Sequence, residues 1–280
     1  WSVDNLEEIS PQKEEWLTMK DKVIIGYIPQ VERTYALVEG GYGIMNEHQV
    51  AIGESTCASR LYAKPIGQGG KALLEASELS QIALERSKSA REAILIMGAL
   101  AEEYGFYSGD WGNNPQQEMG DGGEALTVVD KNEVWMFHIL PDDTGTGAIW
   151  VAQRVPNNHI VACANTFVIR EIPDQGEEND DFMMSTNLHE IGARMGWYDP
   201  SKGNKLNFLK TFAPERYHPS YSHLRIWRIF TFANPLLNLP IDTNAYADDY
   251  PFSVEVSTKH FLSSEDLMNL QSDHFEGTKY

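Results

Sequence analysis

The chain has 280 residues, of which 42% are hydrophobic and 22% are charged, a composition typical of a globular protein with a sizeable core. Its 41 acidic residues outnumber its 22 basic residues, and the formal net charge is −19. This balance excludes the basic patch that a nucleic acid requires, and it disfavours an anionic membrane surface as a partner.

Two cysteines, Cys57 and Cys163, are too few for a disulfide framework, and both are predicted to pack as small apolar residues. The best uncharged run, 229–241, contains prolines and asparagines and does not reach the length of a membrane-spanning helix. We recognise no signal peptide. The sequence therefore predicts a soluble protein, and it leaves the compartment open between the cytoplasm and a lysosomal or secretory lumen.

Residues 1–25 are polar and acidic and predict a lead-in segment without regular structure. Residues 26–280 predict a single domain, because no convincing linker interrupts them. The first elements of this domain are short β-prone runs. The runs 42–45 and 50–53 flank the turn-prone residues Asn46, Glu47 and His48, and this pattern predicts a hairpin.

Residues 75–104 are the clearest helical stretch, with apolar residues recurring at the spacing of one buried helix face. Ser89 followed by Glu92 is a capping-box pattern, so we predict two helices divided near Ser89. Gly105 is predicted to end the second helix. The Gly-, Asn- and Asp-rich residues 106–124 predict a long loop.

The next part of the chain predicts an antiparallel meander, because β-prone runs are joined there by short polar turns. The paired runs are 126–129 with 134–140, and 149–155 with 160–172. An acidic loop is predicted next, then a partly helical segment, then short helices with Pro-rich connections. These three segments are 173–181, 182–196 and 197–280.

The sequence motifs that bind common metals and nucleotides are incomplete in this chain. The H-E-x-x-H zinc pattern is incomplete after His189 and Glu190, and the Gly-rich stretch 67–70 lacks the Ser or Thr of a phosphate-binding loop. We therefore predict neither a metal nor a cofactor. No G-x-S-x-G elbow is present either, and Cys57 is interpreted as a packed residue at a strand end in preference to a catalytic thiol.

Long strings of residues nevertheless occur in a characteristic order. They include IPQV at 28–31, GGYGIMNEHQ at 40–49, IGESTC at 52–57, WVAQRVP at 150–156, ANTFVIREI at 164–172 and DHFEGT at 273–278. These strings closely resemble the dipeptidase A and secernin-like family of cysteine N-terminal-nucleophile hydrolases. The resemblance covers nearly the whole chain from about Gly26 onward.

The resemblance implies an α+β fold of the αββα sandwich type, in which two stacked antiparallel sheets are flanked by helices. It implies hydrolysis of dipeptides or small peptides through a thioester acyl-enzyme. The nucleophile of that family is a cysteine exposed at the new N-terminus after a leader is removed, and its own α-amino group acts as the base.

Trp1 cannot be such a nucleophile, and residues 1–25 do not resemble the family's cysteine-containing first strand. We therefore expect that strand to lie upstream, interpret the chain as truncated at both ends, and predict that it has no peptidase activity. We also expect an incomplete sheet to expose strand edges and to fold poorly.

Four residues are predicted to belong to the site. Asn165 is expected to be a catalytic residue that donates a hydrogen bond to the oxyanion, and Arg225 to be a second catalytic residue, with Arg228 as the competing choice. Glu54 and Ser55, at the end of the predicted hairpin, are expected to bind substrate, with Glu54 suited to a free ammonium group.

Two other functions stay open. Another amide hydrolase on the same scaffold, such as an acylase, would prefer apolar acyl groups to the paired charges of a dipeptide. A non-catalytic interaction protein of the secernin type would need no nucleophile. The sequence also leaves open whether the chain forms a homo-oligomer.

Overall fold

The computed structural model describes residues 6–9, 24–109, 122–213, 219–239, 250–257 and 262–277. Within the predicted lead-in, β1 (Leu6–Ile9) is a strand that pairs antiparallel with β2 (Gly26–Pro29), so a loop throughout 1–25 was too simple a prediction. The other residues of the lead-in, apart from 24 and 25, lie outside the described part of the chain.

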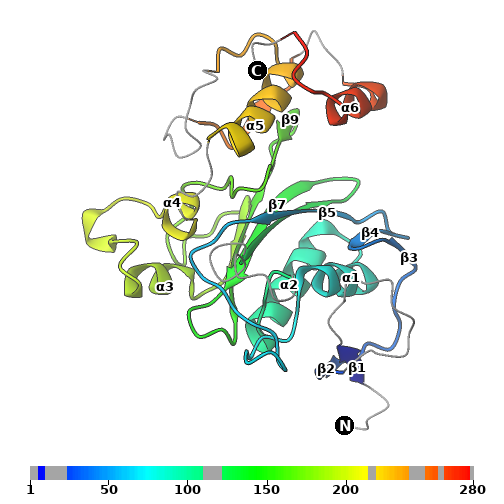
Figure 1. Ribbon diagram of the computed structural model, residues 1–280, viewed down its shortest axis with the longest axis vertical. Helices are drawn as coiled ribbons and strands as arrows, with labels where there is room; N and C mark the ends of the chain where they lie inside the picture. Colours follow the sequence, from blue (N-terminus) through cyan, green and yellow to red (C-terminus); the bar gives the residue numbers. More distant parts are fainter. Residues whose placement is uncertain are drawn as a thin grey trace.

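The centre of the fold is a seven-stranded antiparallel sheet with the strand order β10-β8-β7-β6-β5-β4-β3 (Figure 1). Its members are β3 (Leu37–Glu39), β4 (Gly43–Asn46), β5 (Ala51–Cys57), β6 (Gly123–Val129), β7 (Val134–Pro141), β8 (Ala148–Arg154) and β10 (Phe182–Met184). Together with the helices this confirms the predicted α+β class.

Successive side chains of each strand point to opposite faces of the sheet, and two separate apolar cores result. On β7, for example, Trp135 and Phe137 join the core under helices α1 (Ala76–Arg86) and α2 (Ala90–Tyr104), whereas Met136 joins the core on the other face. The second core contains residues of the irregular segment 162–172 and of the helical region that follows it. Two helices therefore cover one face of the sheet, and the irregular segment with the helical region after it packs against the other.

The predicted helix pair is confirmed as α1 (Ala76–Arg86) and α2 (Ala90–Tyr104). The Ser89 hydroxyl accepts a hydrogen bond from the backbone N–H of Glu92, as a helix cap should. Gly105 ends α2 with φ +78°, a conformation that a side chain disfavours. Gly98 lies inside α2 because the indole of Trp150 occupies the space of a Cβ atom.

The predicted hairpin is confirmed as β4 and β5. The Asn46 amide organises its turn, because Nδ2 donates to the carbonyls of Leu84 and Ser87 while Oδ1 accepts from the N–H groups of His48 and Val50. The strands β6 and β7 of the predicted meander are also confirmed, with a register that runs from Glu124 opposite Ile139 to Val129 opposite Val134.

The pairing of 149–155 with 160–172 is wrong. The neighbour of β8 at the sheet edge is β10, whereas β9 (His159–Val161) leaves the sheet and pairs with β11 (Ser253–Glu255). Asn165 has φ +55°, which an extended strand cannot contain. The N–H groups of Val168 and Ile169 then donate to a side chain, Nε2 of His138, and not to a strand.

The C-terminal third contains α3 (Leu188–Arg194), a 3₁₀ helix Pro200–Lys202, α4 (Phe208–Phe212), α5 (Pro219–Ala233) and α6 (Ser264–Gln271). The prediction of short helices here is correct except for α5, which has 15 residues. Figure 1 shows α5 and α6 together near the C-terminus, beside β9. No described helix combines the length and the apolar character that a membrane span requires.

Candidate active site

The predicted residues Ser55 and Asn165 lie in direct contact, although they are 110 positions apart in the sequence. The N–H of Asn165 donates to Ser55 Oγ at 3.0 Å, and Asn165 Nδ2 donates to the Thr56 carbonyl at 2.8 Å. The left-handed backbone of Asn165 makes both bonds possible, because it turns the chain out of an extended path at this residue. Asparagine tolerates that conformation better than most residues.

Arg225, which lies on α5, contacts Asn165 as well. Its Nη2 donates to Asn165 Oδ1 at 3.0 Å and to the Ala164 carbonyl at 3.1 Å, while its Nε donates to the Tyr221 carbonyl at 2.7 Å. The Tyr221 hydroxyl also lies 3.4 Å from Asn165 Oδ1, and the guanidinium stacks over the Tyr221 ring at 4.4 Å. These contacts fix which end of the Asn165 amide carries the oxygen.

Arg228, the competing choice, serves a different purpose. Its guanidinium forms an ion pair with Asp273, which belongs to the motif near the end of the chain. Arg228 therefore joins α5 to the segment after α6, whereas Arg225 is the arginine of this pair that contacts Asn165.

The two cysteines lie beside this cluster. Cys57 is 0% exposed and packs in the second core, in agreement with its interpretation as a packed residue. Burial raises the pKa of the Cys57 thiol well above its usual value. The hydrogen bond with Cys57 lowers the pKa of Cys163, which is partly exposed and also lies within hydrogen-bonding reach of Ser55. Cys57 is thus unsuited to act as a nucleophile.

Glu54 lies on the opposite face of β5 from Ser55, because adjacent residues of a strand alternate. Its neighbours there are Thr56, whose hydroxyl donates to Glu54 Oε1 at 2.9 Å, and Glu124, which stands opposite Thr56 in the register with β6. Burial, and next the carboxyl group of Glu54, raise the pKa of Glu124 well above its usual value. The four predicted residues are thus near one another but divided between two faces.

One edge of β5 is open over most of its length within the described structure. β5 pairs with β6 at every position from Ala51 to Cys57, but it pairs with β4 only at Ala51. The backbone next to Glu54 and Ser55 therefore faces no described strand on that side. An extended peptide can add to such an edge through main-chain hydrogen bonds.

Neither a general base nor a metal cluster is evident in this part of the chain. His138 is completely buried, and burial lowers its pKa to about 3, so it is a structural acceptor and not a base. Among the described residues, no three His, Cys, Asp or Glu side chains gather as metal ligands would. The cluster therefore consists of hydrogen-bonding and charged side chains.

The sequence analysis missed Tyr221 and Glu124. Tyr221 precedes Arg225 by four residues, the spacing at which side chains meet on a helix, so the predicted arginine could have indicated it. Glu124 was signalled by its place at the start of an apolar β-prone run, where a charged residue is exceptional.

The sequence matches a model of peptidase family C69 over residues 33–280. That match covers most of the chain. The chain belongs to peptidase family C69.

Similar proteins carry dipeptidase names. A "Probable dipeptidase" of Latilactobacillus sakei is 27% identical over 241 residues, which are 84% of this chain and 44% of that protein. A "Probable dipeptidase" of Salmonella dublin is 22% identical over 86% of this chain and 48% of its own length. A "Dipeptidase" of Bifidobacterium longum is 28% identical over 71% of this chain and 35% of its own length. The C69 chain thus spans less than half the length of these relatives.

Proposed function

We propose that this C69 chain carries part of the substrate and oxyanion site of a cysteine-type dipeptidase that hydrolyses dipeptides or small peptides. The single observation that best supports the proposal is the convergence of Ser55, Asn165 and Arg225 from three separate parts of the chain. Membership of the C69 family and the names of the similar proteins support the same reaction class.

In the proposed reaction, a cysteine thiolate attacks the peptide carbonyl carbon, and the carbonyl oxygen becomes an oxyanion. An amide NH2 has two N–H donors, and the bond from Asn165 to Thr56 uses one of them. The second is proposed to donate to the oxyanion, and it would be held in place by the bond from Arg225 to the amide oxygen.

Collapse of the tetrahedral intermediate breaks the C–N bond, and the amine leaves with a proton. The thioester that results is hydrolysed by water, which releases the acid and regenerates the thiol. The proposed nucleophile is an N-terminal cysteine of the intact enzyme, with its own α-amino group as base. The buried Cys57 is not proposed for this role.

Peptide binding to the purified chain tests the proposal without requiring turnover. A dipeptide is expected to shift the NMR signals of the Asn165 side-chain amide. Arg225→Lys is expected to weaken this binding about tenfold, because lysine cannot reproduce the planar fork of arginine. Arg91→Lys is the matched control, since Arg91 pairs with Glu133 at the start of α2, away from the site. Unchanged Asn165 signals at saturating dipeptide would refute the proposal.

Hydrolysis assays separate the remaining possibilities. We expect no dipeptide hydrolysis by the chain alone, and measurable hydrolysis would contradict this expectation. Cys57→Ala and Cys163→Ala would then identify a nucleophile within the chain. Tighter binding of N-acyl amino acids than of dipeptides would instead favour an acylase.

A further inference from the structure

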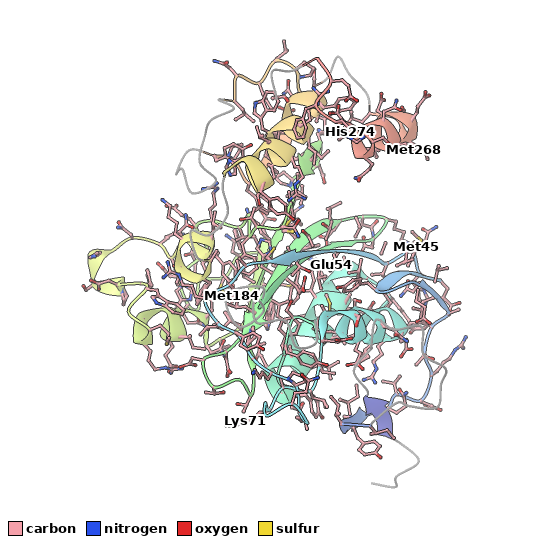
Figure 2. The ribbon with its side chains drawn as sticks, viewed as in Figure 1. Met45, Glu54, Lys71, Met184, Met268 and His274 are labelled. Carbon is pink, nitrogen blue, oxygen red and sulfur yellow. The ribbon has the colours of Figure 1, made fainter. Side chains whose placement is uncertain are left out.

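A buried pair of acidic side chains lies on the face of β5 that turns away from Ser55. Figure 2 shows Glu54 near the middle of the molecule, where β5 passes over helices α1 and α2. Glu124 stands beside it on β6 and is 0% exposed, whereas Glu54 is partly exposed. The carboxyl groups of Glu54 and Glu124 lie within hydrogen-bonding reach of each other.

The described donors around the pair are too few for its four carboxyl oxygens. The Ser108 hydroxyl donates to Glu124 Oε1, and the Thr56 hydroxyl, which donates to Glu54 Oε1, lies within hydrogen-bonding reach of Glu124 as well. Glu124 Oε2 is buried and accepts no hydrogen bond from a described residue. Two carboxylates in contact repel each other, and an unpaired buried charge is costly. The contact therefore requires either a proton between the two groups or a cation from outside.

The burial of the two residues decides which of them holds the proton. Burial favours the neutral form of a carboxyl group, so the proton belongs on Glu124, which is the completely buried member of the pair. Two thiols also interact with the pair. The pKa of Cys57 is raised chiefly by burial and to a smaller extent by both carboxyl groups, whereas the pKa of Cys163 is lowered by its hydrogen bond with Cys57 although Glu54 opposes this. The pair thus presents a single negative charge between β5 and β6, on the face of the sheet that turns away from Ser55.

We infer that Glu124 is a positioning residue whose protonated carboxyl group holds Glu54 in place, and that Glu54 binds the α-ammonium group of a peptide substrate on this face of β5. The inference rests on the proposed function and adds to it the ammonium subsite and its second residue. A metal ion fits less well, because no third acidic, His or Cys ligand gathers here among the described residues. An ammonium group needs only one charge and a few acceptors.

The first test concerns the proton and needs no ligand. Infrared spectra of the chain at about pH 6, where an ordinary glutamate is almost completely ionised, are expected to show a protonated carboxylic acid band. Glu124→Gln should remove this band, and Glu47→Gln, an exposed control on the same hairpin, should retain it. A band that persists in Glu124→Gln would overturn the shared proton.

The pH dependence of the free energy of unfolding is a second test of the proton on Glu124. Because the pKa of Glu124 is raised in the folded state, its contribution is present at low pH and is lost as pH rises through the folded pKa. The Glu124 contribution to the free energy of unfolding should therefore fall with rising pH in the wild type, whatever His138 and the other titrating groups contribute. Glu124→Gln should lack this fall, and equal slopes in the two proteins would contradict the inference.

The second test concerns the ligand. Alanyl-alanine is expected to bind the wild-type chain about 10- to 100-fold more tightly than N-acetyl-alanyl-alanine, the range for a hydrogen bond to a charged group. Glu54→Gln should abolish this preference. Glu124→Gln should keep it, because the glutamine NH2 donates to Glu54 as the protonated acid does, whereas Glu124→Ala should reduce it.

The outcomes are distinguishable. If both peptides bind the wild type equally, the ammonium subsite is wrong and the proposed function stands. If neither peptide binds, the proposed function fails, and the subsite fails with it. If Glu124→Gln loses the preference as completely as Glu54→Gln, Glu124 does not act through a donated proton.

Discussion

Acidification is expected to destabilise the chain through His138, which anchors the segment that carries Asn165. His138 Nε2 accepts hydrogen bonds from the N–H groups of Val168 at 2.9 Å and Ile169 at 3.2 Å. A protonated ring would place its own N–H against these two donors. Burial in the second core also disfavours the charged ring, and it lowers the pKa of His138 to about 3.

The sign and size follow from the two pKa values. The unfolded chain takes up a proton at His138 below about pH 6.5, and the folded chain does not until about pH 3. Stability is therefore lost as pH falls. The loss through this residue is about 2 kcal/mol at pH 5 and about 3 kcal/mol at pH 4. The value at pH 5 depends almost entirely on the unfolded pKa, because the folded ring is still neutral there.

Urea unfolding measured between neutral pH and about pH 4 tests this prediction. The free energies of unfolding of the variants are compared at each pH. Many carboxyl groups titrate over the same range, so His138→Gln is compared with the wild type and with His274→Gln, an exposed control. The stability lost by His138→Gln on acidification should be smaller by the amounts given above. If His138→Gln does not fold, NMR of the wild-type ring at about pH 5 decides directly. Parallel pH profiles, or a ring that is charged at that pH, would refute the reasoning.

Three further outcomes are expected. Asn165→Ala should be less stable than Asn165→Gly by roughly 1 kcal/mol in thermal unfolding. Both variants lose the side-chain amide, but only alanine is strained by the left-handed backbone at this position. A more stable Asn165→Ala variant would contradict this prediction. Cys163 should react with iodoacetamide faster than Cys57, because the pKa of Cys163 is lowered and its side chain is partly exposed. Mass spectrometry of timed samples measures the order of labelling. Faster labelling of Cys57 would be incompatible with the burial of Cys57. Gly98→Ala should lower the free energy of unfolding by about 1–3 kcal/mol in urea unfolding, because the new Cβ would lie 2.4 Å from the Trp150 ring. A stabilised variant would exclude this close packing.

The elements that the sequence predicted correctly are those whose signals are local. Ser89 and Gly105 act through backbone groups within a few residues or through the conformation of a single residue, and Asn46 Oδ1 accepts from N–H groups two and four residues away. Helix ends and hairpin turns depend on such short-range contacts, so the residues themselves indicate them. The helices α1 and α2 and the β4–β5 hairpin were therefore predictable.

The path of the chain after β8 depends on contacts that are distant in the sequence. The β-prone residues of 160–172 predicted a strand beside β8, but apolar composition does not specify a pairing partner. Two features outside local propensity decide the outcome: the φ of Asn165 and the acceptor that His138 offers to Val168 and Ile169. The same features bring Asn165 to Ser55. The error in the strand and the formation of the site thus have one physical origin.

Under the proposed function, the division of the predicted residues between two faces of β5 would affect the choice of substrate. Ser55, Asn165 and the cationic Arg225 lie on one side, and Glu54 with Glu124 lies on the other. A free dipeptide carries an ammonium group at one end and a carboxylate at the other, only two residues apart. If Glu54 holds the ammonium group and Arg225 faces the carboxylate, both charges are matched only when the peptide is short. An N-acyl amino acid would leave the charge of Glu54 without a partner, and discrimination against it would come from that unpaired carboxylate and not from its shape.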